Sequence, residues 1–184
     1  VLRKAAGKGN VDNFVLSVRR LLNQNKIDEA IEECDRQEGS VGNVVKEGLT
    51  TYKALAHDTT MNKKKKMVAL NKSIEEATTL EMPMLEKNMM ILSTLGTVAT
   101  LVALLGTVIG MIKAFSALGS GGGTPDSAAL SIGISEALVN TALGIGTSAV
   151  AIILYNYFTS KIDGLTFKID EIAMSIQQSF AEFH

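Results

Sequence analysis

The chain has 184 residues and is close to neutral, with 18 lysines and arginines against 19 aspartates and glutamates. This balance excludes a strongly basic nucleic-acid-binding protein, and a single cysteine excludes a disulfide framework. With only two histidines, a cysteine–histidine metal site is not expected, and no cofactor is expected either. The mean hydropathy of +0.21 is high for a soluble domain, so the apolar residues must be concentrated in part of the chain.

The amino-terminal part of the chain has the periodicity of short amphipathic helices. An apolar stripe that begins near Asp12 predicts a first helix, and residues 27–34 predict a second. Residues 41–55 predict a third helix. A long fourth helix is expected to start near Asn62 and to kink or break at Pro83. No β alternation of useful length is present, so the sequence predicts an all-α fold. The first stripe consists of Phe14, Val15, Val18, Leu21 and Leu22.

Two long uncharged runs follow this helical part, at residues 88–112 and 137–160. Each exceeds the roughly 20 apolar residues that a helix needs to cross a bilayer. We therefore expect an integral membrane protein with two visible transmembrane helices rather than a hairpin buried in a soluble protein. The expected domains are, in chain order, a cytoplasmic helical domain at 1–88, a first span at 89–118, a periplasmic loop at 119–127, a second span at 128–159 and a cytoplasmic carboxy-terminal helix at 160–184.

The expected orientation follows from the basic residues. All of them except Lys113 lie beyond the two spans, whereas the short Gly- and Pro-containing loop has no Lys or Arg. By the positive-inside rule, the first 88 residues and the carboxy-terminal tail are cytoplasmic and the loop faces outward. Tyr155, Tyr157 and Phe158 stand where an aromatic belt would hold the inner end of the second span.

Polar residues inside the spans are the candidate functional groups. Thr107 and Thr141 lie at similar depths from the loop, and Asn140 is adjacent to Thr141, which favours a polar lining near mid-membrane. The alternative is that each hydroxyl only bonds the carbonyl four residues earlier in its own helix. Glu136 is the one acidic residue well inside a span, and an acidic group at that depth indicates function by default. Lys113 lies at a comparable depth, so an ion pair with Glu136, within or between subunits, is the structural alternative.

The remaining motifs favour packing rather than catalysis. Gly106 and Gly110 form a small-xxx-small pattern that lets another helix approach closely, and we assign Gly144 the same role. Residues 144–149 match a dinucleotide fingerprint by their letters, but they lie inside an apolar helix whose N–H groups are already bonded. No nucleophile–base pair, metal set or cofactor loop is present, so an enzyme is not expected.

These spans resemble a known family. Residues 104–115 (LLGTVIGMIKAF) resemble the second membrane helix of the ExbB/TolQ/MotA proton-channel family, and residues 134–146 (ISEALVNTALGIG), continuing to 155–158 (YNYF), resemble its third. Residues 21–31 and 85–90 are similar to its first cytoplasmic helices and to the start of its second span. The ExbB-like branch fits better than the flagellar-stator branch. Because this family has three spans, the resemblance implies a preceding first transmembrane helix that is missing from this sequence.

The resemblance implies a pentamer in the bacterial inner membrane, whose second and third spans surround a dimer of single-span ExbD-type subunits. Protons would cross on an acidic group of that partner and would drive a TonB-type transducer for outer-membrane import. The pore threonines of the family correspond to Thr107 and Thr141, and its third-helix glutamate corresponds to Glu136. The alternatives are a TolQ-like motor for envelope integrity, a flagellar-type stator and a non-conducting membrane scaffold.

Overall fold

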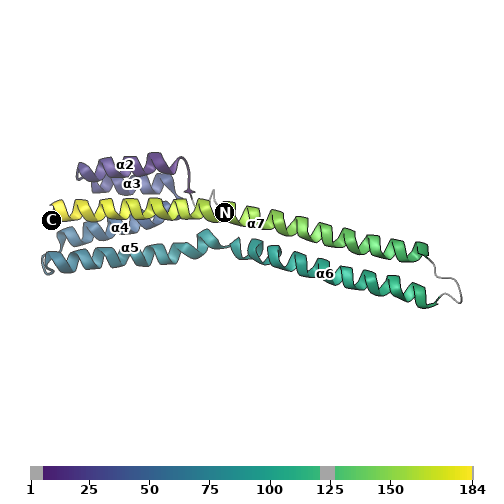
Figure 1. Cartoon of the computed structure of the whole chain (residues 1–184). Helices are drawn as coiled ribbons and strands as arrows, with labels where there is room; N and C mark the ends of the chain where they lie inside the picture. The colour runs from purple at the N-terminus through teal and green to yellow at the C-terminus, as the bar shows by residue number, and fades with distance from the viewer. Residues whose placement is uncertain (1–5, 121–126, 184) are drawn as a thin grey trace. The chain divides into compact units, whose positions relative to one another are not determined.

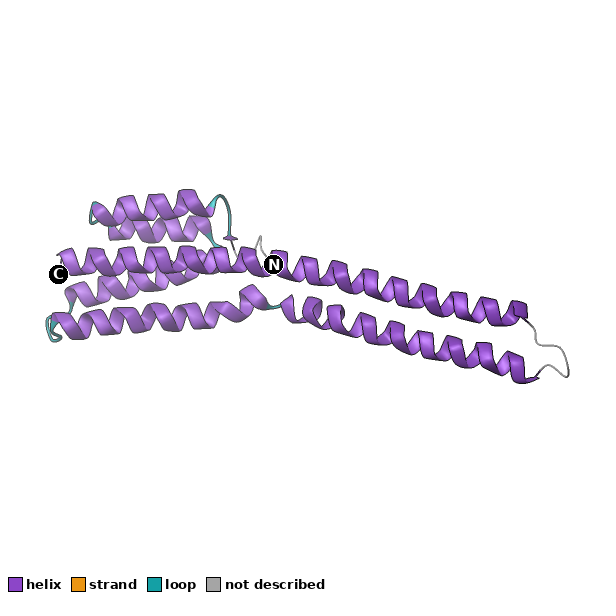
Figure 2. Cartoon of the chain, in the orientation of Figure 1, coloured by secondary structure: helices purple, strands orange, loops and turns teal. Residues whose placement is uncertain are grey.

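The computed structural model describes residues 6–120 and 127–183, and every regular element in these ranges is an α-helix (Figures 1 and 2). The expected all-α fold is therefore confirmed. The chain divides into two compact units: a bundle of α2–α5 with the carboxy-terminal part of α7, and a hairpin of α6 with the amino-terminal part of α7. The helices are α2 (Val11–Asn23), α3 (Ile27–Gln37), α4 (Gly39–His57), α5 (Lys63–Glu86), α6 (Met89–Ser120) and α7 (Ser127–Phe183).

The bundle forms around the apolar stripes of its helices. Helix α2 is capped by Asn10, whose side chain accepts a hydrogen bond of 2.8 Å from the Asp12 N–H, and its predicted apolar stripe is buried throughout. At the centre, the Tyr52 ring of α4 meets the Phe180 ring of α7 edge to face, with centroids 4.9 Å apart. Such aromatic pairs add to the free energy of area burial, so this contact ties α7 to α4.

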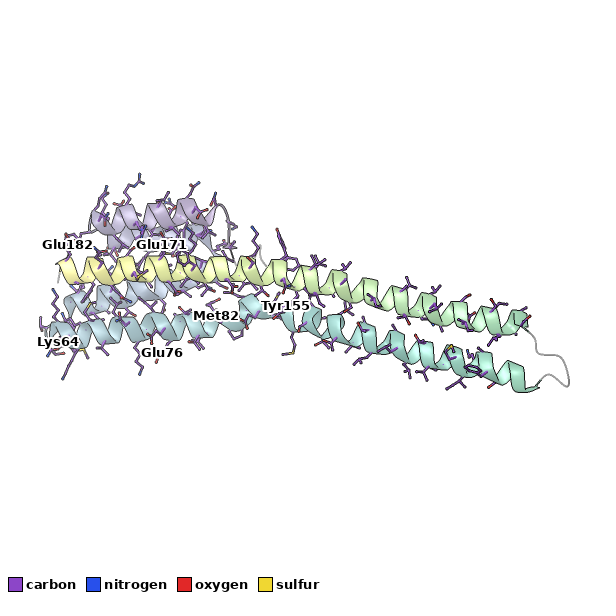
Figure 3. The ribbon with its side chains drawn as sticks, in the orientation of Figure 1. Lys64, Glu76, Met82, Tyr155, Glu171 and Glu182 are labelled. Atoms are coloured by element: carbon purple, nitrogen blue, oxygen red, sulfur yellow. The ribbon has the colours of Figure 1, made fainter. Side chains whose placement is uncertain are left out.

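Charged pairs connect α2 to α7 at the surface of the bundle. The Arg19 guanidinium lies 3.0 Å from a carboxylate oxygen of Glu171, and its Nε donates to the Ser175 hydroxyl at 2.9 Å. Figure 3 shows Glu171 on the carboxy-terminal part of α7. Because partly exposed pairs contribute little free energy, these bonds orient α2 while the apolar core supplies most of the stability.

A sharp corner joins α3 to α4. Glu38 and Gly39 both have positive φ angles, of 54° and 76°, so α4 starts at Gly39, two residues before the predicted start. The preceding Gln37 side chain donates to the Ala6 carbonyl at 2.6 Å. Gly7 has a φ of +79°, and a Cβ atom there would overlap the Gln37 carbonyl. This corner therefore fixes the path of the chain that leads into α2.

The fourth predicted helix starts where expected but ends differently. Asn62 caps α5 by accepting a hydrogen bond of 2.9 Å from the Lys65 N–H, which confirms the predicted start. Helix α5 continues through Pro83 to Glu86, and α6 begins at Met89. Proline removes one backbone donor and crowds the preceding turn, yet the helix persists for three residues before it is interrupted. The break between the two helices therefore lies about one turn after Pro83, the residue at which the sequence predicted it.

Replacement of a buried ring tests the central contact of the bundle. Phe180 is 0% exposed, so Phe180→Ala is expected to cost about 3–5 kcal/mol and to accelerate deuterium exchange of α4 amides on the order of 100-fold. The matched control is Phe167→Ala on the same helix, where the ring is 63% exposed and little change is expected. Equal exchange in the two variants would contradict the assigned core.

Cys34 of α3 predicts a pH dependence for the bundle. Burial, helped by the Asp35 and Glu33 carboxylates, raises the pKa of the Cys34 thiol from 9.0 to about 12. The unfolded chain therefore loses its thiol proton first as pH rises through 9, so stability falls between pH 9 and 12. At pH 10 the loss is about 1 kcal/mol. Urea midpoints at pH 8 and pH 10, followed by circular dichroism, should show a larger decrease in the wild type than in Cys34→Ala. An identical decrease of the urea midpoint in the wild type and in Cys34→Ala would contradict the assigned role of the Cys34 thiol.

Candidate functional site

The hairpin unit has its apolar surface on the outside. Both α6 and α7 are long and apolar enough to cross a membrane, yet only 11% and 17% of their most apolar windows are buried within the chain. A core helix of a soluble protein is mostly buried, so the alternative of a buried soluble hairpin does not fit. Water is a poor solvent for so large an apolar patch, and lipid or other chains must cover it. The large side chains more than half exposed here include Leu101, Val102, Leu105, Ile112, Leu143 and Ile153.

Small residues line the contact between α6 and the amino-terminal part of α7. A Cβ atom added at Gly110 would lie 3.0 Å from the Ala137 Cβ, and one added at Gly144 would overlap the Ala103 Cβ. Without large side chains between them, the two backbones approach closely, which is how membrane helices associate. The structure thus places Gly110 and Gly144 at the contact itself.

The close contact brings the two predicted threonines together. The hydroxyls of Thr107 on α6 and Thr141 on α7 contact each other directly. Thr107 Oγ1 also lies 3.1 Å from the Ala103 carbonyl oxygen, and Thr141 Oγ1 lies 3.2 Å from that of Ala137. The two alternatives drawn from the sequence are therefore both present: the threonines meet at one level of the hairpin, and each also bonds a carbonyl of its own helix.

This geometry defines what the threonine pair can do chemically. Each hydroxyl has one proton to donate, and nearby carbonyl oxygens can accept it. Each hydroxyl oxygen keeps lone pairs, so the pair can accept a hydrogen bond from a carboxylic acid. To donate to a carboxylate, a threonine must release its intrahelical bond, which rotation about χ1 allows.

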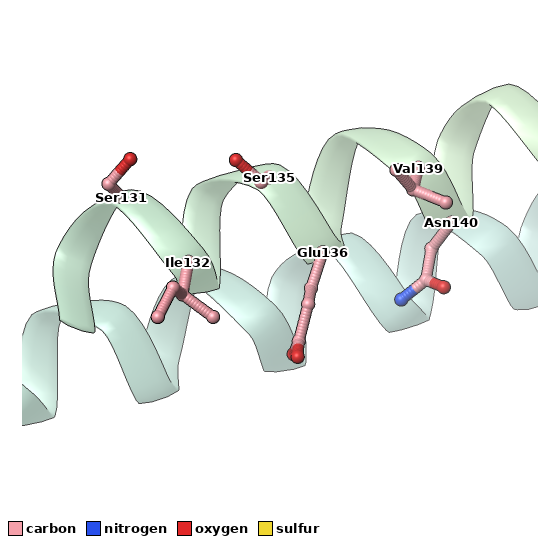
Figure 4. Close-up of a pocket in the computed structure, with 6 residues that line it drawn as sticks. All are labelled: Ser131, Ile132, Ser135, Glu136, Val139 and Asn140. Atoms are coloured by element: carbon pink, nitrogen blue, oxygen red, sulfur yellow. The ribbon is translucent and has the colours of Figure 1, made fainter. Parts of the chain in front are cut away.

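The two predicted charged residues are not brought together within the chain. Both Lys113 and Glu136 are exposed, and neither belongs to any ion pair among the described residues. Asn140 lies beside Gly106, where its Nδ2 would be 3.2 Å from an added Cβ. Figure 4 shows Glu136 and Asn140 along one side of α7, with Ser131 and Ser135 on an adjoining side.

Three serines of the hairpin were missed by sequence reasoning. The Ser148 hydroxyl is buried and donates to the Gly96 carbonyl on α6, which links the two helices two turns from the threonine pair. Ser131 and Ser135 line the groove that also contains Glu136. The available signal was the four-residue interval between Ser131 and Ser135, which matches the interval between Glu136 and Asn140 and so places two polar pairs on neighbouring faces of one helix.

Two predictions from the sequence remain to be compared with the structure: the absence of a metal site and the position of the loop. No group of His, Cys, Asp and Glu side chains in residues 6–120 and 127–183 is arranged to hold a metal ion. The predicted loop at 119–127 falls largely on residues 121–126, including Asp126, which lie outside the described residues.

Comparison with known proteins identifies relatives of this chain by sequence. The model of the MotA/TolQ/ExbB proton channel family matches residues 36–171. The chain is 33% identical over 113 residues to a putative biopolymer transport protein ExbB-like 3 of Synechocystis, covering 61% of this chain and 54% of the relative. It is 34% identical over 109 residues to a putative ExbB homologue of Methanothermobacter thermautotrophicus, covering 59% and 38%. An ExbB of Helicobacter pylori is 39% identical over 84 residues, covering 46% and 57%.

A polar site inside a tightly packed pair of apolar helices defines an all-α membrane protein. The chain belongs to the MotA/TolQ/ExbB proton channel family. The matched parts span between 38% and 57% of the length of these three relatives.

Two neighbouring glycines of α7 test the packing of the hairpin. Gly144→Ala is expected to push α6 and α7 apart, because the new methyl group would overlap Ala103, whereas Gly146 has open space around it. With Cys34→Ala as background, Thr107→Cys with Thr141→Cys should form a disulfide readily. Adding Gly144→Ala should reduce its yield several-fold, at a cost of about 1–3 kcal/mol, and adding Gly146→Ala should not. Equal yields would refute the close approach.

Proposed function

We propose that this chain is the proton-conducting subunit of an ExbB–ExbD-type motor, which uses the proton motive force to energise a TonB-type transducer for outer-membrane import. Membership of a proton-channel family and the likeness to proteins named ExbB support this proposal. The observation that carries it is the Thr107–Thr141 hydroxyl contact, set between two long helices that are mostly apolar.

The proposed mechanism uses the acceptor and donor capacity of the threonine pair. An acidic group on a partner helix must be tolerated both protonated and ionised while it passes through the membrane. The Thr107 and Thr141 hydroxyls can accept from its acid form and, after rotation, donate to its carboxylate. A wholly apolar lining would hold the acid in its neutral form and stop transport. Glu136 and Asn140 extend the polar lining toward the loop.

The proposed assembly is a pentamer around two single-span ExbD-type helices. The exposed large apolar side chains of α6 and α7 support it, because they provide surface for neighbouring copies and for lipid. We place the assembly in the bacterial inner membrane. The basic residues, concentrated in the first 88 residues, favour a cytoplasmic position for that part and for the carboxy-terminal tail.

A non-conducting scaffold is the second candidate function, and one observation favours it. The two threonine hydroxyls contact each other, and each lies within hydrogen-bonding distance of a carbonyl of its own helix. Threonines that only hold the two helices together would be bonded in this way. A TolQ-like motor would use the same residues and differ in its partners.

Removal of one hydroxyl at constant volume separates the channel from the scaffold. Thr141→Val is expected to lower proton flux through proteoliposomes that contain the complex with its single-span partner at least about tenfold, since one hydrogen bond contributes about 1–3 kcal/mol when its partner is left unpaired. The control is Thr147→Val, whose exposed hydroxyl donates only to the Leu143 carbonyl, at 2.8 Å. Native mass spectrometry must show the same oligomer for both variants.

The outcomes differ between the two functions. Wild-type flux in an intact Thr141→Val complex would refute the proposed channel role of the pair. A loss of the oligomer in Thr107→Val and Glu136→Gln, with no separate effect on flux, would support the scaffold.

A further inference from the structure

A patch of four polar side chains lies on the first four turns of α7. Ser131, Ser135, Glu136 and Asn140 line one groove, with Ile132 and Val139 between them (Figure 4). All four polar residues are exposed in the chain. The Ala137 side of the helix faces α6, and Ser135 lies two residues away, about 200° around the axis. The serine side of the patch therefore points away from α6.

The four polar side chains of the patch have no partners among the described residues. Thr94 and Thr147 each donate to the carbonyl four residues earlier at 2.8 Å, and the Thr107–Thr141 pair is bonded as described above. Within the described residues, the hydroxyls of Ser131 and Ser135, the Glu136 carboxylate and the Asn140 amide make no hydrogen bond or ion pair. The chain therefore bonds the hydroxyls of Thr94, Thr107, Thr141 and Thr147 and leaves this patch unsatisfied.

Lipid is a costly surrounding for such a patch. A carboxylate, an unpaired hydroxyl and an unpaired amide are all less stable inside the bilayer than in water, because lipid offers them no hydrogen-bond partner. Glu136 lies nine residues from the start of α7 at Ser127, about 14 Å along the axis, which is too deep for its short side chain to reach the interface. The four groups must meet a polar surrounding.

A line of serines runs along α7 from the patch to the loop end of the hairpin. Ser127, Ser131 and Ser135 follow one another at intervals of four residues, so their hydroxyls form a line along α7 from its first residue to the level of Glu136. Beyond Asn140 the same side continues with the apolar Leu143. The polar line thus starts at the end of the helix and stops within the span.

We propose that Ser131, Ser135, Glu136 and Asn140 line a water-filled recess that opens at the loop end of the hairpin and ends at Asn140. Water satisfies all four groups without a further side chain, and it reaches the recess along the serine line. Resting on the proposed function, this recess is the route by which protons move between the loop side and Glu136.

Thiol accessibility tests the recess in the whole complex reconstituted with its single-span partner. On a Cys34→Ala background, Ser131→Cys and Ser135→Cys are each exposed to a charged, membrane-impermeant thiosulfonate added to both faces of the membrane. Because only hydrated thiols ionise and react, both should label at least tenfold faster than two apolar controls.

The controls match the recess in exposure and in depth. Ile112→Cys lies on α6 level with Ser135, since the Gly110–Ala137 and Ala114–Gly133 contacts bracket both positions, and Ile112 is 59% exposed in the chain. Leu143→Cys continues the Glu136 side of α7 seven residues further on and is 66% exposed. Both should stay unlabelled.

Two labelling results would refute the proposed recess. Absence of labelling at Ser131→Cys and Ser135→Cys would mean that lipid or a partner helix covers the patch, and a disulfide to a cysteine-bearing partner helix would identify the latter. Equal labelling at Ile112→Cys or Leu143→Cys would mean general exposure. Proton flux is measured separately. The expected labelling without proton flux would refute the proposed function but not the recess. Proton flux without labelling would refute the recess but not the proposed function.

Discussion

The close approach of α6 and α7 is the contact on which the membrane unit depends. It requires side chains of minimal size, and Gly110, Ala114, Ala137 and Gly144 provide them. Large side chains at these positions would separate the backbones, and no apolar driving force within lipid would bring them back. Because the contact is between backbones, it permits one register of the hairpin, and that register sets the level of every polar group on the two helices.

The polar groups of the hairpin fall into two sets in consequence. Those directed into the contact are paired: Thr107 with Thr141, and Ser148 with the Gly96 carbonyl. Those directed away from it, Ser131 and Ser135 among them, have no partner among the described residues, and Asn140 has none there although it lies against Gly106. The chain therefore pairs Thr107, Thr141 and Ser148 internally and leaves groups such as Ser135 and Glu136 to its surroundings.

The bundle follows different physics from the hairpin. Its core is built from large side chains, with Tyr52 against Phe180 at the centre, and its surface carries paired charges such as Arg19 with Glu171. Such a core draws its stability from the exclusion of water. Helix α7 contributes to both units: in its first part small residues such as Ala137 and Gly144 contact α6, and in its last part large residues such as Ile172 and Phe180 are buried in the bundle.

Sequence alone determined the helical class, the apolar stripe of α2, the two apolar spans and the matched depth of Thr107 and Thr141, because periodicity and rise per residue are local properties. The end of α5 after Pro83, the positive φ at Glu38, the Ser148–Gly96 bond and the absence of a Lys113–Glu136 pair within the chain were decided by tertiary structure. The Ser148–Gly96 bond and the missing pair depend on which faces two helices turn toward each other, and a side chain's spacing along one helix does not specify its neighbour on another.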